Sequence, residues 1–369
     1  MKKIITILLS LTLIFTFTFT LTGCGKSSSK DNVKIGCIYI GSTNDGGFTQ
    51  TMSESLHKAA KDIGHIELIE NENTGDSDSQ KVKDVATNMI DKGATIIVGC
   101  SYGFGKPLQE LAKQEKYKDI AFLSFSDPEA YEQNCETFFG SMDQARYLTG
   151  MACAAASRTG KLGYVAAHPF TEVQIGINAF TLGAQTINPD IEVKVVYINS
   201  WGDAELEKTA AEQLISTGCD VLTYHADSTA TQVAAKEHAI CATGWNSKNN
   251  VCGDSYVTGA YWDFTNYFTE RFITIIDGKF KPVNNKPFSF YGSLKDGMIN
   301  VDEFGPAVPP AIQKKIEAKK QEMIDGKFSP FSGLIKYADG SILCNEGQTL
   351  TVEEIWTINN VIEGVTAIK

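Results

Sequence analysis

The chain lacks the sequence patterns of metal centres and of nucleophilic catalysis. Its five histidines are dispersed, without HExxH or HxH, so we expect no metal site. His225, Asp227 and Ser228 have the residue types of a catalytic triad, but they stand in one strand and loop, where alternate side chains point to opposite faces. Asp143 and Arg146 share one predicted helix, a spacing that favours a local ion pair. We therefore expect no enzyme, metal or cofactor.

Basic charge, paired cysteines and nucleotide motifs are scarce as well. The net charge is -11, which argues against nucleic acid and anionic lipid as partners. Nine cysteines occur without a CxxC, and no disulfide pairing can be read from them. The loop after Ile40 has glycines at 41 and 46, but Gly47-Phe48 stands where a phosphate loop needs Lys-Ser/Thr. A phosphate-binding loop is therefore not expected there.

The first 23 residues have the pattern of a secretory signal. Two lysines precede an almost unbroken apolar and threonine run over 4–21, which ends at Leu21-Thr22-Gly23-Cys24. This pattern predicts a signal peptide over 1–23, cleavage before Cys24 and a lipid on its thiol. The alternative is an uncleaved membrane helix. Residues 24–33 are predicted to be a flexible lipidated tether, which places the exported protein on the outer face of the cell membrane or the periplasmic face of a membrane.

Short apolar runs alternate with amphipathic helical patterns along the rest of the chain. The stretch IGCIYIGSTNDGGF over 35–48 reads as a buried strand and a glycine-rich loop, and a helical pattern follows it. Further strands are expected over 66–70, 95–100, 121–125, 137–140, 162–167, 193–199, 221–225 and 240–244. Helices are expected over 80–92, 108–114, 143–157, 172–186, 205–217, 229–237, 264–277 and 312–324. Two such series predict an α/β protein with two doubly wound parallel-sheet lobes.

The loops that follow these strands carry aromatic and polar side chains. Open α/β sheets bind ligands at the carboxyl ends of their strands. The candidate ligand-binding residues at these ends are Asn44, Asp45, Phe48, Tyr102, Trp201, Asp203, Asp227 and Trp245. Rings that stack on a planar heterocycle, with Asp and Asn at its edge, would suit this set. Each residue also has a structural alternative: Asp203, for example, can be a helix N-cap.

Five segments carry a family resemblance. They are IGCIYIGSTNDGGFTQ, FFGSMDQARYLTGMACAAAS, EVQIGINAFTLGAQTINPD, NSWGDAELEKTAAEQLISTGCDVLTYHADSTA and DGKFSPFSGLIKYADGS. Together they resemble the basic-membrane-protein (BMP) lipoproteins, substrate-binding components of ABC importers for purines and purine nucleosides, and the last three resemble the adenine-binding branch. The resemblance implies the type I periplasmic-binding-protein fold, with two lobes joined by a three-segment hinge. It implies an N-terminal lobe over 34–141 and 258–287, a C-terminal lobe over 142–257 and 288–331, and a C-terminal extension over 332–369.

The resemblance also implies roles for single residues. Phe48 and Trp201 stand where the family places two rings that sandwich the purine, and Asp227 stands at the strand end that reaches the base or sugar. Nucleoside-binding members have a lysine for the ribose near the position of Trp262. A bulky ring there favours a free purine base, above all adenine. The implied partners are an ABC permease and its ATPase, and the implied state is a monomer. A nucleoside-binding importer subunit and a sensor that reports to a membrane partner remain alternatives.

Overall fold

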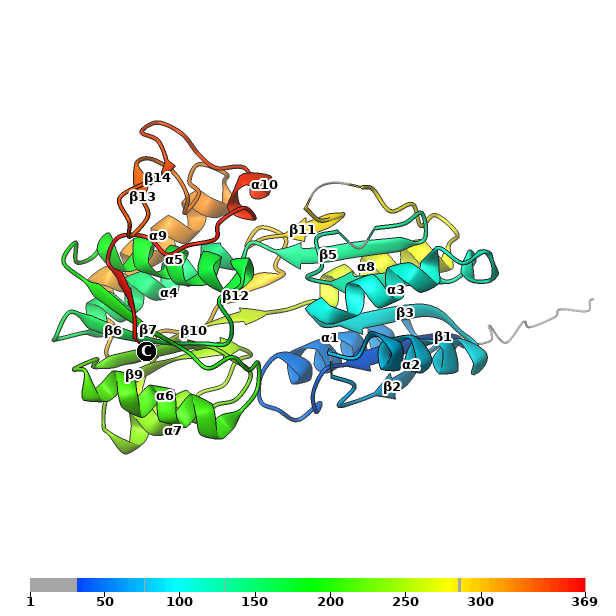
Figure 1. The fold of residues 1–369 in the computed structure, drawn as a ribbon, viewed down its shortest axis with the longest axis horizontal. Coiled ribbons are helices and arrows are strands. Elements are labelled where there is room, and N and C mark those ends of the chain that lie inside the picture. The colour runs from blue at the N-terminus through cyan, green and yellow to red at the C-terminus, as the bar shows by residue number, and fades with distance from the viewer. Residues whose placement is uncertain (1–31, 76, 130, 285–286, 369) are drawn as a thin grey trace, which may run out of the picture. The chain divides into compact units, whose positions relative to one another are not determined.

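The computed structural model describes residues 32–75, 77–129, 131–284 and 287–368. The predicted signal peptide, the predicted lipidation site Cys24 and nearly all of the tether lie outside the described residues. In the described part, no helix combines the length and the apolar character that a membrane span requires. The predicted α/β fold with two parallel-sheet lobes is confirmed: the strands form two large sheets, each flanked by helices (Figure 1).

The first sheet has six parallel strands in the order β11-β5-β4-β3-β1-β2. Its strands are β1 (Val33–Tyr39), β2 (Ile66–Asn71), β3 (Ala94–Cys100), β4 (Ala121–Phe125), β5 (Cys135–Gly140) and β11 (Phe290–Gly292). The helices packed with it are α1 (Phe48–Ile63), α2 (Ser79–Asp91), α3 (Gly105–Ala112) and α8 (Thr265–Ile276). The central strands are nearly continuous apolar runs because helices cover both faces of the sheet. We call this part the first lobe.

The second sheet has seven strands in the order β12-β10-β9-β8-β6-β7-β15, parallel except for β12. Its strands are β6 (Lys161–Ala166), β7 (Glu192–Tyr197), β8 (Val221–His225), β9 (Cys241–Asn246), β10 (Tyr256–Trp262), β12 (Ile299–Val301) and β15 (Val365–Ala367). Its helices are α4 (Met142–Ala156), α5 (Thr171–Gln185), α6 (Ala204–Ser216), α7 (Ala230–Glu237) and α9 (Pro310–Ile324). We call this part the second lobe.

Helices α4 and α5 pack backbone against backbone. A methyl group on Gly150 would overlap the carbonyl oxygen of Phe180, and one on Gly183 would overlap the carbonyl oxygen of Tyr147. Glycine is required at both positions because no other residue permits so close an approach. The contact fixes α5 against the second lobe, and with it the first turn of α5, which carries Glu172.

Three strands join sheets that the predicted boundaries did not give them. Strand β10 pairs with β9 in the second sheet, although 258–287 was predicted in the first lobe. Strand β11 pairs with β5 in the first sheet, although 288–331 was predicted in the second lobe. Strand β15 pairs with β7, so the extension completes the second sheet. Which sheet a short strand joins depends on long-range pairing, and local sequence patterns do not encode that choice.

The C-terminal extension contacts both lobes. It contains the hairpin of β13 (Ile335–Lys336) and β14 (Ile342–Cys344) and the short helix α10 (Val352–Ile355). Trp356, directly after α10, packs edge-on against Phe139 and Phe288 with ring centroids 5.1 and 4.8 Å apart. Its Nε1 donates to the Tyr291 hydroxyl at 3.3 Å. The extension is therefore anchored by β15 on the second lobe and by Trp356 against β5 and β11 of the first.

Candidate ligand-binding site

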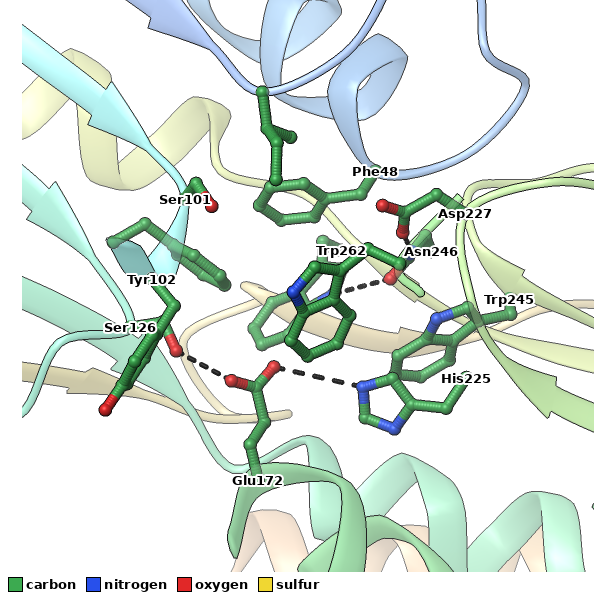
Figure 2. A pocket seen from close by; sticks show the side chains of 13 residues that line it. Phe48, Ser101, Tyr102, Ser126, Glu172, His225, Asp227, Trp245, Asn246 and Trp262 are labelled. Carbon is green, nitrogen blue, oxygen red and sulfur yellow. Dashed lines mark hydrogen bonds and ion pairs between the residues drawn. The ribbon is translucent and has the colours of Figure 1, made fainter. Parts of the chain in front are cut away.

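A pocket with an empty volume of about 460 Å³ lies where strand ends of the two sheets meet (Figure 2). The first lobe lines it with Ile40, Phe48, Ser101, Tyr102, Phe125 and Ser126. The second lobe lines it with Glu172, Trp201, His225, Asp227, Trp245, Asn246 and Trp262. A concave, largely aromatic site with a few polar groups has the composition of a small-molecule pocket.

Aromatic rings form the walls, and other rings pack against them. Phe48, the first residue of α1, packs on Phe125 at a centroid distance of 4.8 Å. Trp201, in the loop between β7 and α6, packs edge-on against His168 at 5.1 Å. Among the described residues, no ring contact joins Phe48 to Trp201, so the two rings face the pocket independently. A planar ligand can therefore stack on either ring.

A chain of hydrogen bonds orients one carboxyl group at the pocket edge. Trp262 Nε1 donates to Asn246 Oδ1 at 3.2 Å, and Asn246 Nδ2 donates to Asp227 Oδ1 at 3.0 Å. Burial raises the pKa of Asp227 well above its usual range, and the nearby acids Asp45, Glu207 and Glu172 raise it further. Asp227 is therefore disposed to keep its proton, and a neutral carboxyl group both donates and accepts.

A second carboxyl group bridges the lobes. Glu172 Oε2 accepts from the Ser126 hydroxyl at 2.7 Å, which joins α5 to the end of β4. Glu172 Oε1 lies 3.8 Å from His225 Nε2. Burial lowers the pKa of His225 to about 4, so the imidazole is neutral near pH 7. Figure 2 shows Ser126 and His225 on opposite sides of Glu172.

Further contacts hold the lobes together beside the pocket. The carbonyl oxygen of Gly46 accepts from Ser247 Oγ at 2.7 Å and from Asn249 Nδ2 at 2.6 Å. A methyl group on Gly47 would overlap the carbonyl oxygen of Asp227, so the two backbones touch at this point. The described conformation is therefore closed, with the loop before α1 seated on the second lobe.

Comparisons with known proteins agree with this geometry. The family model for Bmp, an ABC transporter substrate-binding protein described as PnrA-like, matches residues 32–329. The chain belongs to the Bmp family. A purine-binding protein of Brucella abortus is 29% identical over 345 residues, covering 92% of this chain and 95% of that protein. A Haloferax volcanii protein that carries the name ABC transporter glucose-binding protein is 27% identical, covering 84% of this chain and 76% of that protein.

Solved structures show the same fold at low identity. An ABC transporter solute-binding protein from Conexibacter woesei has a TM-score of 0.65 and 20% identity, covering 80% of this chain and 98% of that chain. This Bmp protein is thus the substrate-binding component of an ABC transporter, and a binder rather than an enzyme, as the sequence predicted. Such a component lies outside the cytoplasm, and its partners in the transporter are a permease and an ATPase.

The structure gathers six of the predicted site residues in the pocket of this Bmp protein: Phe48, Tyr102, Trp201, Asp227, Trp245 and Trp262. The other three are absent from the described lining. Asn44 is exposed, and its Oδ1 accepts from the Ser42 hydroxyl. Asp45 accepts from three backbone N–H groups in the loop and first turn of α1. Asp203 is the N-cap of α6. Because both aspartates serve local backbone, their predicted ligand contacts are not supported.

Five polar lining residues were not among the predicted ligand contacts, and strand ends locate most of them: Ser101, for example, directly follows β3. Ser126 directly follows β4, Asn246 ends β9, and His225 ends β8. Ser126 and Asn246 also have left-handed backbone, with φ of 71° and 65°. Such a backbone is uncommon outside glycine and tends to occur at functional sites. Glu172 has no strand-end signal, because it lies in the first turn of α5.

The predicted local ion pair of Asp143 with Arg146 is wrong. Both residues are described, and no ion pair joins them. Arg146 instead donates to Thr223 Oγ1 at 3.2 Å and to the Tyr224 carbonyl at 2.8 Å. Its guanidinium also lies 3.4 Å from the ring centroid of Trp245, which fixes that ring at the back of the pocket. Within the described part of the chain, no cluster of three or more His, Cys, Asp or Glu could hold a metal ion.

Proposed function

We propose that this Bmp protein is a cell-surface lipoprotein, anchored through Cys24, that captures a purine base and delivers it to its permease. Adenine is the proposed base. The observation that carries the proposal is the pairing of Phe48 and Trp201 on opposite lobes with the carboxyl group of Asp227 beside them. A flat base would stack on the rings while Asp227 meets its edge. The purine-binding relative from Brucella abortus supports the same ligand class.

The hydrogen-bonding pattern at Asp227 suits adenine. Adenine presents an exocyclic N–H donor next to a ring nitrogen acceptor. A neutral carboxyl group presents an acceptor next to a donor, and Asn246 leaves the second oxygen of Asp227 available for this pairing. Guanine also presents an acceptor beside a donor, at O6 and N1, so pairing with a neutral acid does not by itself exclude it. Asp227 would thus form hydrogen bonds with both atoms of this adenine edge.

The pocket lining favours a base over a nucleoside. Trp262 is 4% exposed and stacks on Phe264 at a centroid distance of 5.1 Å, so its ring closes one side of the pocket. None of the described lining residues is lysine or arginine. The positively charged residue nearest in sequence to the lining residue Asn246 is Lys248. Its Nζ lies 4.8 Å from the centroid of the Tyr261 ring, and Lys248 is absent from the described lining. Ribose hydroxyls in this pocket would lose water without gaining a cationic donor, at about 1–3 kcal/mol for each unpaired group.

Competition binding tests the ligand assignment. The protein without its signal peptide is titrated calorimetrically with adenine, hypoxanthine, guanine, adenosine and glucose. We expect adenine to bind most tightly, adenosine at least about a hundredfold more weakly if two hydroxyls remain unpaired, and glucose not at all. Adenosine binding as tightly as adenine would refute the base preference. Glucose binding would favour the function named for the Haloferax volcanii relative.

Membrane fractionation tests the anchor. We expect the wild-type protein in the membrane fraction, and the Cys24→Ala protein either released or retained as a longer precursor, because the lipid requires the thiol. A Cys37→Ala variant is the matched control, since Cys37 is buried in β1. A Cys24→Ala protein that stays on the membrane at the mature size would contradict lipidation.

A further inference from the structure

Three buried polar atoms converge on one glycine behind the ligand pocket. A methyl group placed on Gly176 of α5 would lie 3.2 Å from the Tyr164 hydroxyl, 3.3 Å from His225 Nδ1 and 3.7 Å from Arg146 Nε. None of the three atoms has a hydrogen-bond partner among the described residues. The three residues are at most 5% exposed, so bulk water does not reach the atoms. Isolated buried polar atoms are costly, and three at one point indicate a shared partner.

The Arg146 guanidinium cannot turn away from this recess. Its two terminal nitrogens donate to Thr223 and to the Tyr224 carbonyl, and its face lies on Trp245. Of the three N–H groups that remain, the one on Nε belongs to an atom without a partner, and this atom lies 3.7 Å from a methyl group placed on Gly176. An arginine N–H is only a donor, so the partner must offer an acceptor to it.

The imidazole of His225, in contrast, requires a hydrogen-bond donor in the recess. It is neutral near pH 7, because burial lowers its pKa to about 4, and so carries one N–H. Its Nε2 faces the Glu172 carboxyl oxygen at 3.8 Å, and Figure 2 shows the other ring nitrogen turned away from Glu172. An N–H on Nε2 suits a carboxylate, which leaves Nδ1 as an acceptor that needs a donor. The partner in the recess must therefore accept from Arg146 and donate to His225.

We propose that one water molecule occupies this recess, bound by Arg146 Nε, Tyr164 Oη and His225 Nδ1, and that it fixes His225 as the Nε2–H tautomer. Water both accepts and donates, and buried waters commonly have about three protein partners. Gly176 and His225 also line a small hollow behind the ligand pocket. The tautomer in turn holds Glu172 where it accepts from Ser126 of the first lobe.

This water site concerns how the pocket is organised and does not depend on which ligand the pocket takes. Glycine at position 176 is part of the site, because a side chain there would fill the recess. In a helix interior glycine is less favourable than alanine. The site thus offers a reason for a glycine in the middle of α5 at a point where no backbone contact requires one.

Two measurements on the wild-type protein test the proposal directly. A crystal structure at about 2 Å or better should show a water within hydrogen-bonding distance of all three atoms. Nitrogen NMR on histidine-labelled protein, assigned with His225→Gln, should show an unprotonated Nδ1 and a protonated Nε2 at neutral pH. The proposal would be overturned by an empty recess or by a protonated Nδ1. It would also be overturned if the recess held a chloride ion, which a bromide soak would reveal through the anomalous scattering of bromide at the same place.

Two variants test whether the proposed water affects ligand binding in the pocket. Gly176→Ala should displace the water, shift the His225 tautomer signal and weaken adenine binding about two- to tenfold, the value of one hydrogen bond. Tyr224→Phe removes a hydroxyl of similar burial on β8, bonded by Gln232 and outside the recess, and should leave the tautomer unchanged. An unchanged tautomer in Gly176→Ala would overturn the proposal. If wild-type protein binds no adenine, the proposed ligand fails, while the water and tautomer are still measured.

Discussion

The two sides of the pocket differ in chemistry. Both lobes contribute aromatic rings. The first lobe adds an isoleucine and two serine hydroxyls, whereas the second adds Glu172, His225 and Asp227, together with Asn246. Every carboxyl and imidazole group of the described lining thus belongs to one lobe. The difference indicates a division of work: the second lobe selects the ligand edge, and the first lobe covers the ligand with Phe48 as it closes. Closure is favoured by contacts that exist only when both lobes touch the ligand.

Two aspartates show the same contrast at the level of single side chains. Asp45 and Asp227 both follow a buried strand and a short turn. Asp45 receives three backbone N–H groups and so holds the loop before α1. Asp227 receives one side-chain N–H from Asn246 and faces the pocket. Asp45 therefore orders the loop before α1, and the carboxyl group of Asp227 is available for the ligand.

The largest expected effect comes from removing the selective carboxyl group. Asp227→Ala should weaken adenine binding by about a hundredfold or more, because two ligand hydrogen bonds are lost and both ligand atoms stay buried and unpaired. Asp227→Asn should lose less than about tenfold, since a carboxamide also offers a donor beside an acceptor. Titration calorimetry measures both. Equal losses in the two variants would mean that the carboxyl group acts through its charge, and the comparison between lobes would need revision.

Removing an aromatic ring should have the next largest effect on adenine binding. Base–aromatic stacking contributes about 1–3 kcal/mol per ring, so Phe48→Ala and Trp201→Ala should each weaken adenine binding about ten- to a hundredfold. Phe170→Ala is a suitable control, because Phe170 packs on Trp201 at 6.2 Å and is absent from the described pocket lining. A loss of less than about twofold in both ring variants would exclude the sandwich.

Closure itself gives a smaller effect. Gly47→Ala places a methyl group against the Asp227 carbonyl and should hold the lobes apart, weakening adenine binding by about tenfold. Small-angle scattering should show that adenine reduces the radius of gyration of the wild-type protein and reduces it less in Gly47→Ala. Gly64→Ala controls for the loss of a glycine next to α1, although its positive φ of 72° adds local strain. Identical scattering profiles with and without adenine would mean that the site is rigid.

The sequence predicted the βα order closely because buried strands and amphipathic helices leave strong local periodicity. Strand β8 was predicted at its observed bounds, Val221–His225. What the sequence could not predict is the partner of each side chain. Asp45 and Asp227 have similar local surroundings, and only the folded backbone shows which carboxyl group is occupied. Arg146 was assigned to a neighbour on its own helix, but its partners lie on β8, about eighty residues away. Such contacts follow from tertiary packing rather than from spacing.

The pH dependence of binding gives the smallest change and tests the protonation of Asp227. Burial and the facing acids Asp45, Glu207 and Glu172 raise its pKa, so the folded protein retains this proton at pH values where the unfolded chain has lost it. Rising pH therefore removes the donor that adenine needs and places a negative charge against its ring nitrogen. The free energy of unfolding should also fall as pH rises through this range, because the folded state binds the extra proton.

Adenine affinity should decline by no more than about tenfold per pH unit. Burial raises the pKa of Glu207 to about 8, and the negative charge of an ionised Glu207 raises the pKa of Asp227, which opposes the decline. The Asp227→Asn protein has no proton to lose at this position, so most of the decline should disappear when calorimetry compares this variant with the wild-type protein over the same pH series. A flat wild-type profile would show that Asp227 binds as a carboxylate, and would turn the expected preference toward bases with two neighbouring donors.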